Sequence, residues 1–577
     1  MPLPLDLKGR PDERVLRQLV AALLYEGIVP ALQRSVDGET VFSWSLGGRQ
    51  FRCRGAIGPF GRLRLAAGSV EMLDDADSWI APVLAPLVAA LPGNGPTRGK
   101  LLDELTQTIA FCRWNERHLP DRARRAMSFA ELEGALDEGH PYHPCFKART
   151  GFSVKDHAAF GPEVGHAFQL VWLLVARKHL ACEISGDEDA FWQAELADAW
   201  SDLTAARLKL NAPSDDFGLV PLHPWQWREL GDALRAGWIA AGEAHYLGPL
   251  GDRYTATQSV RSLLNQDRPT AASVKLPLNI VNTSSRRTLD PPSVCTAPVI
   301  SRWIADIVAG DPAFGERYPL TILKEYAGVI ADRGGSLAGQ VAAIWRDSAE
   351  ATLLAGEAVV PFNALMMVEA DGRPFADDWI ARFGLMPWIN RLIEIAVLPV
   401  WHLLVHHGLA VEAHGQNMLL VHRDGWPVRL ILRDFHESIE FSPGFLREPD
   451  KAPDFAALDP AYKDAEPDQY YWTDNLDSLR ELVMDTLFVY NLSEISHLLD
   501  HAYNLPEALF WQRVDSALGA YATEHSAAER LARLGCDQPQ ILTESLMTRK
   551  LLAAKPEYHH TVPNALAAGA LQRRRKS

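Results

Sequence analysis

The stretch VEAHGQNMLLV, residues 411–421, sets a cluster of polar side chains directly against a run of purely apolar residues. The polar residues are Glu412, His414, Gln416 and Asn417, and MLLV follows them at once. A short apolar run bounded by polar residues is typical of a buried strand. We therefore expect the four polar side chains to lie in a loop at the mouth of a strand, facing a cleft.

The residues downstream continue the pattern as a β-hairpin. MLLVH, the turn RDGWP and VRLILR indicate strand, turn and strand, and Asp434 follows the second strand. Because a hairpin returns the chain to its starting point, Glu412, Asn417 and Asp434 can surround one ion. Their oxygens suit a hard cation, and the sequence predicts these three residues as Mg²⁺ ligands. The alternative is that Glu412 and Asn417 satisfy loop amides and Asp434 caps a turn.

His414 lies between two of these predicted ligands and is expected to face the same cleft. A histidine near Mg²⁺ can contact phosphate or a substrate carboxylate, or accept a proton from an incoming nucleophile. A packing role is the alternative. The order acid, Asn, hairpin, acid also resembles the catalytic loop of protein kinases.

The stretch SVRSLLNQDRPTAASVKLPLNIVNTSSRRT, 259–288, is a positive island with Asp267 as its one acid. Lys275 lies in an apolar run, where a lone ammonium is costly unless an anion meets it. Arginine adds forked donors that match phosphate or carboxylate. The island predicts an anion site, with a solvated basic sheet face as the alternative. Its cations and neutral donors are Arg261, Arg268, Lys275, Arg286, Arg287, Ser259, Ser262, Asn282, Thr283 and Ser284.

A third polar segment is GHPYHPCFKARTGFS, 139–153. Its prolines fix the backbone and predict a rigid loop rather than a helix. Lys147 and Arg149 are expected to contact an anion. His140 and His143 have no suitably spaced third or fourth ligand, which disfavours a zinc site.

Composition limits the class of protein. The chain has 577 residues, 47% of them hydrophobic and 23% charged, as in ordinary globular proteins. Its net charge of −16 disfavours general nucleic-acid binding, which needs a basic surface. No apolar run approaches the roughly 20 residues of a membrane span, and the first 15 residues carry acids and prolines instead of a signal sequence. We expect a cytoplasmic protein without disulfides, because its six cysteines are scattered.

The periodicity of the whole chain predicts an α+β protein. Regions are placed at 1–160, 161–345 and 346–577, with a linker at 91–99. Helices are predicted at 13–34, 168–182, 189–210, 388–407 and within 477–553, strands at 41–46, 50–55 and 62–66, and a sheet within 217–300.

In order along the chain, the segments GHPYHPCFKARTGF, HPWQW, SVRS, KLPLNIVNTSSRR, EAHGQN and RDF span residues 139–434. Together they resemble the NRPS-independent siderophore synthetases, the family of aerobactin, alcaligin and desferrioxamine synthetases. The resemblance implies a cupped hand of thumb, fingers and palm, with ATP held between fingers and palm. It also implies that ATP and Mg²⁺ adenylate a carboxylate of citrate or a related acid. An amine or hydroxyl nucleophile then displaces AMP.

The resemblance also assigns roles to single residues. Ser259, Arg261 and Ser262 match a phosphate-binding S-x-R-T motif, with Ser in place of the usual Thr. Lys275 and Arg287 match the residues at the α-phosphate and acyl-adenylate.

The remaining matches concern the motif at residues 411–421 and the residues expected to bind substrate. Glu412, Asn417 and Asp434 match the residues that bind the nucleotide and its metal ion. His414 matches a residue that lies between the phosphate and the carboxylate. The catalytic candidates are therefore Lys275, Arg287 and His414. A homodimer is expected by likeness. The candidates for substrate binding are His140, Lys147, Arg149, Thr283 and, by a weaker match, Lys550.

Two other functions stay open at this point. One is a kinase-like phosphotransferase, although no GxGxxG loop precedes Lys275 and an aspartate base is missing. The other is a non-catalytic protein that binds citrate or a siderophore. If the chain is a siderophore synthetase, a citrate derivative is the preferred acid, and the amine is left undetermined.

Overall fold

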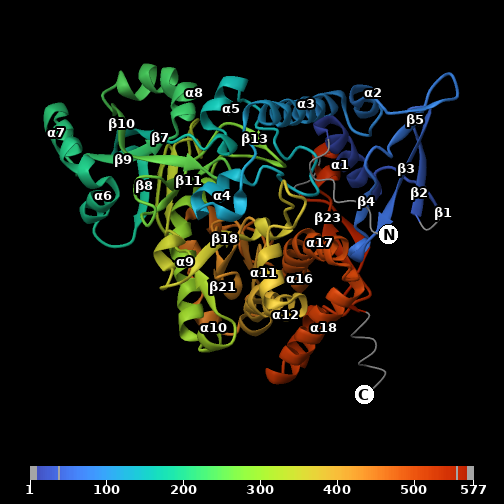
Figure 1. Ribbon diagram of the computed structural model, residues 1–577. Coiled ribbons are helices and arrows are strands. Elements are labelled where there is room, and N and C mark those ends of the chain that lie inside the picture. Colours follow the sequence, from blue (N-terminus) through green and yellow to red (C-terminus); the bar gives the residue numbers. More distant parts are fainter. Residues whose placement is uncertain (1–9, 37–38, 554–556, 568–577) are drawn as a thin grey trace.

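An eight-stranded antiparallel sheet forms the middle of the protein in this computed structural model, which describes residues 10–36, 39–553 and 557–567. The strand order is β8-β16-β17-β12-β11-β10-β7-β9. Figure 1 labels strands β7 to β11 of this sheet. The strands are β7 (Phe168–Ala176), β8 (Leu180–Ile184), β9 (Phe217–Leu222), β10 (Ala244–Ala256), β11 (Ser262–Asn265), β12 (Ser273–Lys275), β16 (Glu325–Ala331) and β17 (Ala342–Arg346).

Alternating side chains cover this sheet on both faces. Ile330 and Ile344 pack toward helix α9 (Pro291–Gly310), while Val329 and Trp345 join the core that contains helix α6 (Glu188–Leu196). Successive residues of a strand point to opposite faces, so both faces are apolar. The other helices of this part are α7 (Trp200–Leu210) and α8 (Pro224–Leu234).

The prediction of a helix at 168–182 is wrong, because these residues form β7 and β8. The six residues 170–175 are all buried, and β7 is hydrogen-bonded on both sides, to β10 and to β9. A strand buried on both faces has no polar alternation, and its periodicity is indistinguishable from that of a buried helix. The prediction at 189–210 is confirmed by α6 and α7.

The N-terminal part joins helix α1 (Pro11–Tyr25) to a second antiparallel sheet. Its order is β1-β2-β3-β5-β6, with β4 paired to β3, so the predicted strands at 41–46, 50–55 and 62–66 are confirmed. The predicted helix at 13–34 ends early, at Tyr25. The elements are β1 (Leu32–Val36), β2 (Glu39–Leu46), β3 (Arg49–Ile57), β4 (Leu63–Leu65), β5 (Glu71–Leu73), β6 (Trp79–Ile80), α2 (Leu84–Ala89), α3 (Gly95–His118), α4 (Phe129–Ala135) and α5 (Val154–Phe160).

The predicted linker at 91–99 is instead the start of helix α3. The Asn94 side chain caps this helix by accepting a hydrogen bond from the Thr97 N–H at 2.9 Å, and Pro96 lies in its first turn. Proline and a capping Asn are favoured at a helix start for the same reasons that they occur in loops.

The C-terminal part contains a four-stranded sheet of order β15-β21-β20-β18 together with several helices. The predicted hairpin is confirmed as β20 (Met418–Arg423) and β21 (Trp426–Leu432). Strand β15 (Leu320–Ile322) pairs in parallel with β21, so this sheet recruits residues from before the predicted boundary at 345. The division into three regions otherwise stays a prediction.

The remaining elements surround these two sheets. They are β13 (Val281–Asn282), β14 (Ser285–Arg286), α10 (Ala313–Glu316), β18 (Ala358–Pro361), α11 (Asp377–Phe383), α12 (Leu385–Ala396), α13 (Leu398–His402), β19 (Leu409–Val411), β22 (Ile439–Phe441), α14 (Phe455–Leu458), α15 (Pro460–Lys463), α16 (Leu476–Val483), α17 (Ser493–Tyr503), α18 (Glu507–Glu524), α19 (Ala528–Leu534), β23 (Gln540–Glu544), α20 (Leu546–Leu552) and β24 (His559–Pro563). The prediction of helices from 477 to 553 missed β23.

The helical run Leu385–His407 is long and apolar enough to cross a membrane by length and composition alone, but 83% of its most apolar window is buried inside the protein. The packing of this helical run in the protein core therefore accounts for its apolar composition. The first residues, on which the expectation of no signal sequence partly depends, lie outside the described part of the chain.

The two ends of the described chain meet beside α1. Met547 and Leu551 of α20 belong to the same core as α1 and α3, and the Glu26 carboxylate accepts hydrogen bonds from the Met547 and Thr548 N–H groups at 2.9 and 2.7 Å. Figure 1 shows this C-terminal segment in red next to the blue helix α1.

Lys147 and Arg149 form a buried cluster with Glu163 and are not available to the predicted anion. Arg149 donates two hydrogen bonds of 2.8 Å to the Glu163 carboxylate, and Lys147 forms an ion pair with it. All three side chains are at most 2% exposed. Burial acts to raise the pKa of Glu163, but the two cations outweigh it and hold that pKa well below its usual range.

Glu163→Gln is therefore expected to destabilise the protein by about 3–5 kcal/mol at pH 7, because it leaves two buried cations without a counter-charge. Urea unfolding followed by tryptophan fluorescence measures the shift of the midpoint. Because the folded pKa of Glu163 is lowered, the difference from wild type is present above pH 4.5 and shrinks as the pH falls through that pKa. Asp232→Asn, at a fully exposed ion pair, is the control. An unchanged midpoint in Glu163→Gln contradicts the interpretation.

Candidate active site

A polar cavity of about 630 Å³ lies where the large sheet, the β13–β14 hairpin, the loops after β19 and β21 and the C-terminal segment meet. The structure brings most of the predicted site residues to this one cavity. Its lining includes His140, Ser259, Arg261, Lys275, Thr283, Arg287, Glu412, His414, Asn417 and Asp434.

The register of the β20–β21 hairpin explains why Asn417 and Asp434 meet. Met418 pairs with Leu432, so the residues just outside the two strands are also neighbours. The Arg433 N–H donates to the Asn417 carbonyl at 3.1 Å, and Arg433 Nε donates to the Gln416 carbonyl at 2.9 Å. The hairpin that the sequence predicts therefore sets the spacing of two predicted site residues.

Hydrogen bonds and close packing fix the backbone of the loop 412–417. The Ala413 N–H donates to Thr486 Oγ1 at 2.9 Å, and Asn491 Nδ2 donates to the Ala413 carbonyl at 3.2 Å. Gly415 is required by close packing, because a Cβ there would lie 2.0 Å from Asn363 Oδ1. With its backbone fixed in this way, the loop presents Glu412, His414 and Asn417 to the cavity.

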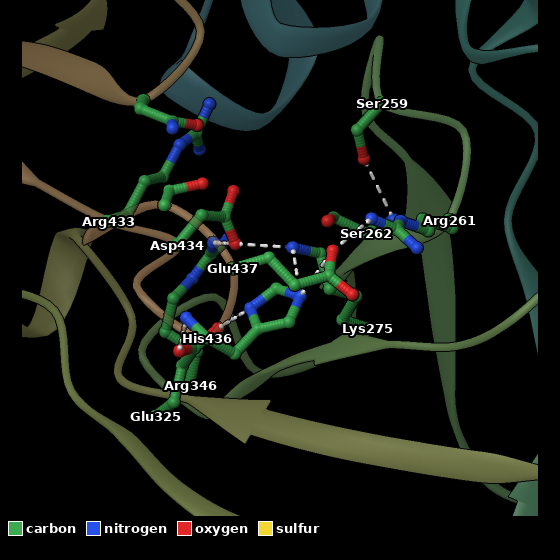
Figure 2. A network of polar contacts seen from close by, with 12 residues as sticks. Ser259, Arg261, Ser262, Lys275, Glu325, Arg346, Arg433, Asp434, His436 and Glu437 are labelled. Carbon is green, nitrogen blue, oxygen red and sulfur yellow. Dashed lines mark hydrogen bonds and ion pairs between the residues drawn. The ribbon is translucent and has the colours of Figure 1, made fainter. Parts of the chain in front are cut away.

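Lys275 and Asp434 form the central contact of the site (Figure 2). Lys275 Nζ donates to Asp434 Oδ1 at 2.9 Å, and Arg346 Nη1 donates to the same oxygen at 2.6 Å. Burial acts to raise the pKa of Asp434, but Arg346 and Lys275 keep it well below its usual range. Burial lowers the pKa of Lys275, and Asp434 opposes that change. Two sheets are thus joined by an ion cluster at the cavity wall.

Glu325 and His436 anchor this cluster. The Glu325 carboxylate accepts from the Phe435 and His436 N–H groups at 3.2 and 3.1 Å, and lies 2.8 Å from His436 Nδ1. His436 Nε2 lies 3.4 Å from Lys275 Nζ. The sequence analysis missed Arg346, Glu325 and His436. An arginine within the apolar run VAAIWR and a histidine directly after RDF were the available signals.

The Ser259–Ser262 turn lies beside Lys275, because Ser262 pairs with Lys275 across β11 and β12. The Ser262 N–H donates to Ser259 Oγ at 2.9 Å. Val260 has φ of 69°, which is rare for a β-branched residue. Its backbone is therefore strained and is held in this conformation by the surrounding structure. The turn directs Ser259 and Arg261 to the cavity, whereas Ser262 is not part of its lining.

Arg287 is a cation without a carboxylate partner. Its Nη2 donates to the Asn282 carbonyl at 2.8 Å, its Nε is buried with no hydrogen bond, and no carboxylate of the described residues lies within ion-pair distance. Burial and the nearby Arg261 lower its pKa to about 9. A half-buried guanidinium without a carboxylate partner is suited to an anionic ligand.

The predicted Mg²⁺ ligands fit a hard cation by the chemistry of their donors. Glu412, Asn417 and Asp434 all line the cavity and offer oxygen atoms. Both cations contact Asp434 Oδ1, and in the described part of the chain no hydrogen bond reaches Oδ2. Glu412 Oε2 accepts from Ser438 Oγ at 2.6 Å, and Asn417 Nδ2 lies 3.4 Å from it.

Carboxylates gather in the part of the lining contributed by the C-terminal segments. Burial and neighbouring acids, Glu557 first among them, raise the pKa of Glu440 to about 8, and Glu440 Oε2 is buried without a hydrogen bond from the described residues. Burial also raises the pKa of Glu544 to about 7 and that of Asp485 well above its usual range. The acids of this group are Glu412, Glu440, Asp485, Glu544 and Glu557, which we call the acidic end.

Lys550 is not part of the lining, contrary to its predicted contact with substrate. Its ammonium forms an ion pair with the buried Glu104 and donates to the Thr283 carbonyl at 2.9 Å. Thr283 has φ of 58°, so Lys550 helps to hold a strained cavity residue. The neighbouring Arg549 lines the cavity.

Comparisons with known proteins agree with this architecture. The model of the IucA / IucC family matches residues 128–367, and a model described as ferric iron reductase FhuF-like transporter matches residues 386–558. A citryl-spermidine/3,4-dihydroxybenzoyl-citryl-spermidine:spermidine ligase of Bacillus anthracis is 32% identical over 574 residues, covering 96% of this chain and 93% of that protein. A 2-[(L-alanin-3-ylcarbamoyl)methyl]-3-(2-aminoethylcarbamoyl)-2-hydroxypropanoate synthase of Staphylococcus aureus is 28% identical over 581 residues, covering 98% and 94%.

The crystal structure of the petrobactin biosynthesis protein AsbB from Bacillus anthracis str. Sterne matches with a TM-score of 0.90 at 32% identity, covering 98% of this chain and 97% of that one. The mixed fold with its polar cavity is that of siderophore synthetases. This chain belongs to the IucA / IucC family, and the resemblance inferred from its motifs is confirmed.

Arg287→Gln is expected to weaken the binding of inorganic pyrophosphate about 10- to 150-fold, because a hydrogen bond to a charged group contributes about 1.5–3 kcal/mol. Isothermal titration calorimetry at fixed salt measures the affinity. Arg286→Gln is the matched control, since Arg286 is the adjacent, exposed residue of β14. Equal losses in the two variants would mean that only general positive charge matters at this cavity.

Proposed function

We propose that the protein is an ATP-dependent siderophore synthetase that adenylates a carboxylate of citrate or a citrate derivative and condenses it with an amine. The observation that carries the proposal is the joining of the cationic island to the oxygen-donor loops, with Lys275 and Asp434 2.9 Å apart in one cavity. The names of the relatives, a citryl-spermidine ligase among them, support the class of product.

The basic part of the cavity suits the first half-reaction. A carboxylate oxygen of the acid attacks the α-phosphorus of ATP, the bond to the bridging oxygen breaks, and pyrophosphate leaves. Lys275 and Arg287 neutralise the charge that develops on the phosphoryl oxygens. Ser259 and Arg261 hold the departing phosphates, and Glu412, Asn417 and Asp434 would hold a Mg²⁺ ion that balances their charge.

Condensation follows in the same cavity. The amine nitrogen attacks the carbonyl carbon of the acyl-adenylate, the carbon–oxygen bond to phosphate breaks, and AMP leaves. The amine gives up a proton. His414 Nδ1 accepts the Gln416 N–H at 3.1 Å, so its Nε2, 3.7 Å from Glu412 Oε1, carries a hydrogen and can donate to a phosphate or carboxylate oxygen of the substrates. Holding both reactants in place supplies most of the rate enhancement of such a step.

The acidic end favours an amine that carries more than one positive charge. One ammonium-bearing arm can pair with Glu440, Glu544 and Asp485 while the reacting amine, which must be neutral, reaches the acyl-adenylate. Spermidine, printed in the name of the Bacillus anthracis relative, is an amine of this kind. Localisation in the cytoplasm and a homodimeric state stay predictions.

Product analysis separates the proposal from its alternatives. With ATP, citrate and an amine, we expect AMP and pyrophosphate in equal amounts, and a hydroxamate when hydroxylamine replaces the amine. Asp434→Asn is expected to lower the rate roughly 10²-fold through loss of charge stabilisation. Asp424→Asn, at the exposed turn of the same hairpin, is the control. ADP as product would establish a kinase, and failure to bind ATP would establish a binding protein.

The acidic end predicts a dependence of KM on amine charge and pH. Glu440→Gln is expected to raise KM for a diamine or triamine about tenfold or more and to leave KM for ATP and for a monoamine unchanged. The pKa of the Glu440 carboxyl is about 8, and loss of its proton strengthens the binding of a cation. The KM of the wild type for a diamine or triamine should therefore fall as the pH rises from 7 to 9. The variant should lose this dependence.

Steady-state kinetics with a diamine and a monoamine of equal length measure the difference. Glu466→Gln, at an exposed glutamate outside the cavity, is the control. A parallel rise in KM for both amines would contradict selection by the second charge.

A further inference from the structure

A second cluster of potential ligands lies away from the cavity, in the C-terminal part. Three histidines, His402, His406 and His407, point their Nε2 atoms at one oxygen of Asp311. The distances from Asp311 Oδ2 are 3.0, 3.8 and 2.9 Å, respectively. None of these four residues lines the proposed active site.

An irregularity in the helix creates this convergence. His402 and His406 are four residues apart, which places them on one face of an α-helix. The chain then follows a π-helical turn at Leu403–His407, where the repeat is five residues, and His407 joins the same side as His402. Such π turns are rare and occur often at functional sites.

The spacing of the four donor atoms matches a tetrahedral ion. Metal–ligand distances of about 2.0–2.1 Å give edges of about 3.3 Å between donors in a tetrahedral zinc site. The observed separations from Asp311 Oδ2 lie within about 0.5 Å of that value. All four donors lie within 4.8 Å of one another, so small side-chain rotations suffice to enclose an ion.

The surroundings of the cluster are also those of a metal site. Asp311 Oδ1 accepts the Ala313 N–H at 2.9 Å, which leaves Oδ2 for the histidines, and His402 Nδ1 lies 2.8 Å from the Tyr521 hydroxyl. Hydrogen bonds of this kind orient ligating residues.

An ion has a route to this position. His402 is 1% exposed and His407 7%, whereas His406 is 23% and Asp311 17% exposed. Asp311 also borders a surface hollow of about 450 Å³. The His406 and Asp311 side is therefore the open side of the cluster.

We propose that Asp311, His402, His406 and His407 bind one divalent transition-metal ion of the zinc type. Three imidazoles and one carboxylate are a ligand set that zinc accepts, and hard ions such as Mg²⁺ disfavour it. The ion would tie the end of α9 to the end of the α12–α13 run. It would thereby fix the start of β19, which leads directly into the Glu412 loop of the proposed active site.

Hydrogen bonding alone is the competing explanation, and His406 distinguishes the two. His402 and His407 lie within hydrogen-bond distance of Asp311, but His406 at 3.8 Å does not. Without a metal, His406 adds little to the cluster. With a metal, it is one of four ligands.

The test uses the full chain, stripped of metal with a chelator and titrated with Co²⁺ or Zn²⁺ in the absence of Mg²⁺ and ATP. We expect one ion per chain by elemental analysis and visible ligand-field absorption of four-coordinate Co²⁺ that Zn²⁺ abolishes. His406→Gln should weaken binding at least tenfold. His525→Gln is the matched control, because His525 stacks on Tyr521 beside the cluster but does not face Asp311.

Both variants should keep the far-UV circular dichroism spectrum and the urea-unfolding transition of the metal-free wild type, which shows that they are folded. Absence of stoichiometric Co²⁺ or Zn²⁺ binding by the wild type would overturn the proposal. Equal binding by wild type and His406→Gln would overturn it as well, since the ion would then lie elsewhere.

Discussion

One carboxylate oxygen of Asp434, shared between Lys275 and Arg346, joins the two halves of this protein at the cavity. The two cations stand on the face of the large sheet that α9 covers, and the acid ends the hairpin of the C-terminal sheet. Removing the Asp434 carboxylate leaves two poorly solvated cations without this partner, which costs several kcal/mol. A well-packed apolar contact can stabilise such a junction equally well, so stability alone does not account for the ion cluster.

This contact divides the cavity wall by charge. Lys275, Arg261 and Arg287 stand on the side of the sheet, while the acidic end is assembled from short strands, loops and a helix of the C-terminal part. A chain with net charge −16 repels an anion at long range, so anion binding depends on this local group of cations. The same arrangement gives a cationic partner a separate place in one cavity. In the proposed reaction, charge separation within about 630 Å³ would orient two oppositely charged reactants.

The parts of the site that are local in sequence could be predicted, and the parts that are assembled from distant segments could not. The hairpin after Asn417 joins two apolar strands through the two-residue turn Asp424–Gly425, and this turn fixes both its register and the neighbourhood of Asp434. The lysine in an apolar strand signalled a charge that needs a partner. By contrast, the acidic end combines Glu412, Glu440, Asp485 and Glu544, which are far apart along the chain and carry no shared motif.

The wrong predictions have equally specific causes. Strand β7 lacks alternation because it is covered on both faces, so its apolar run was taken for a helix. Lys147 and Arg149 have the composition of an anion site, but their anion is Glu163 of the same chain. A basic residue pattern shows that a negative charge is needed and does not show whether a ligand or a side chain provides it. Burial decides between them, and burial follows only from the fold.

Backbone strain at the cavity supports a site that is formed before any ligand arrives. Val260, Thr283 and Asp434 all have positive φ, at 69°, 58° and 66°, and each lies on or within a segment that lines the cavity. Such conformations cost about 1–3 kcal/mol each and persist only where neighbouring contacts hold them. The Ser259–Ser262 turn, Lys550 on the Thr283 carbonyl and the two cations on Asp434 are those contacts. The strain is thus balanced by the fold itself, so that ligand binding energy is not spent on arranging these residues.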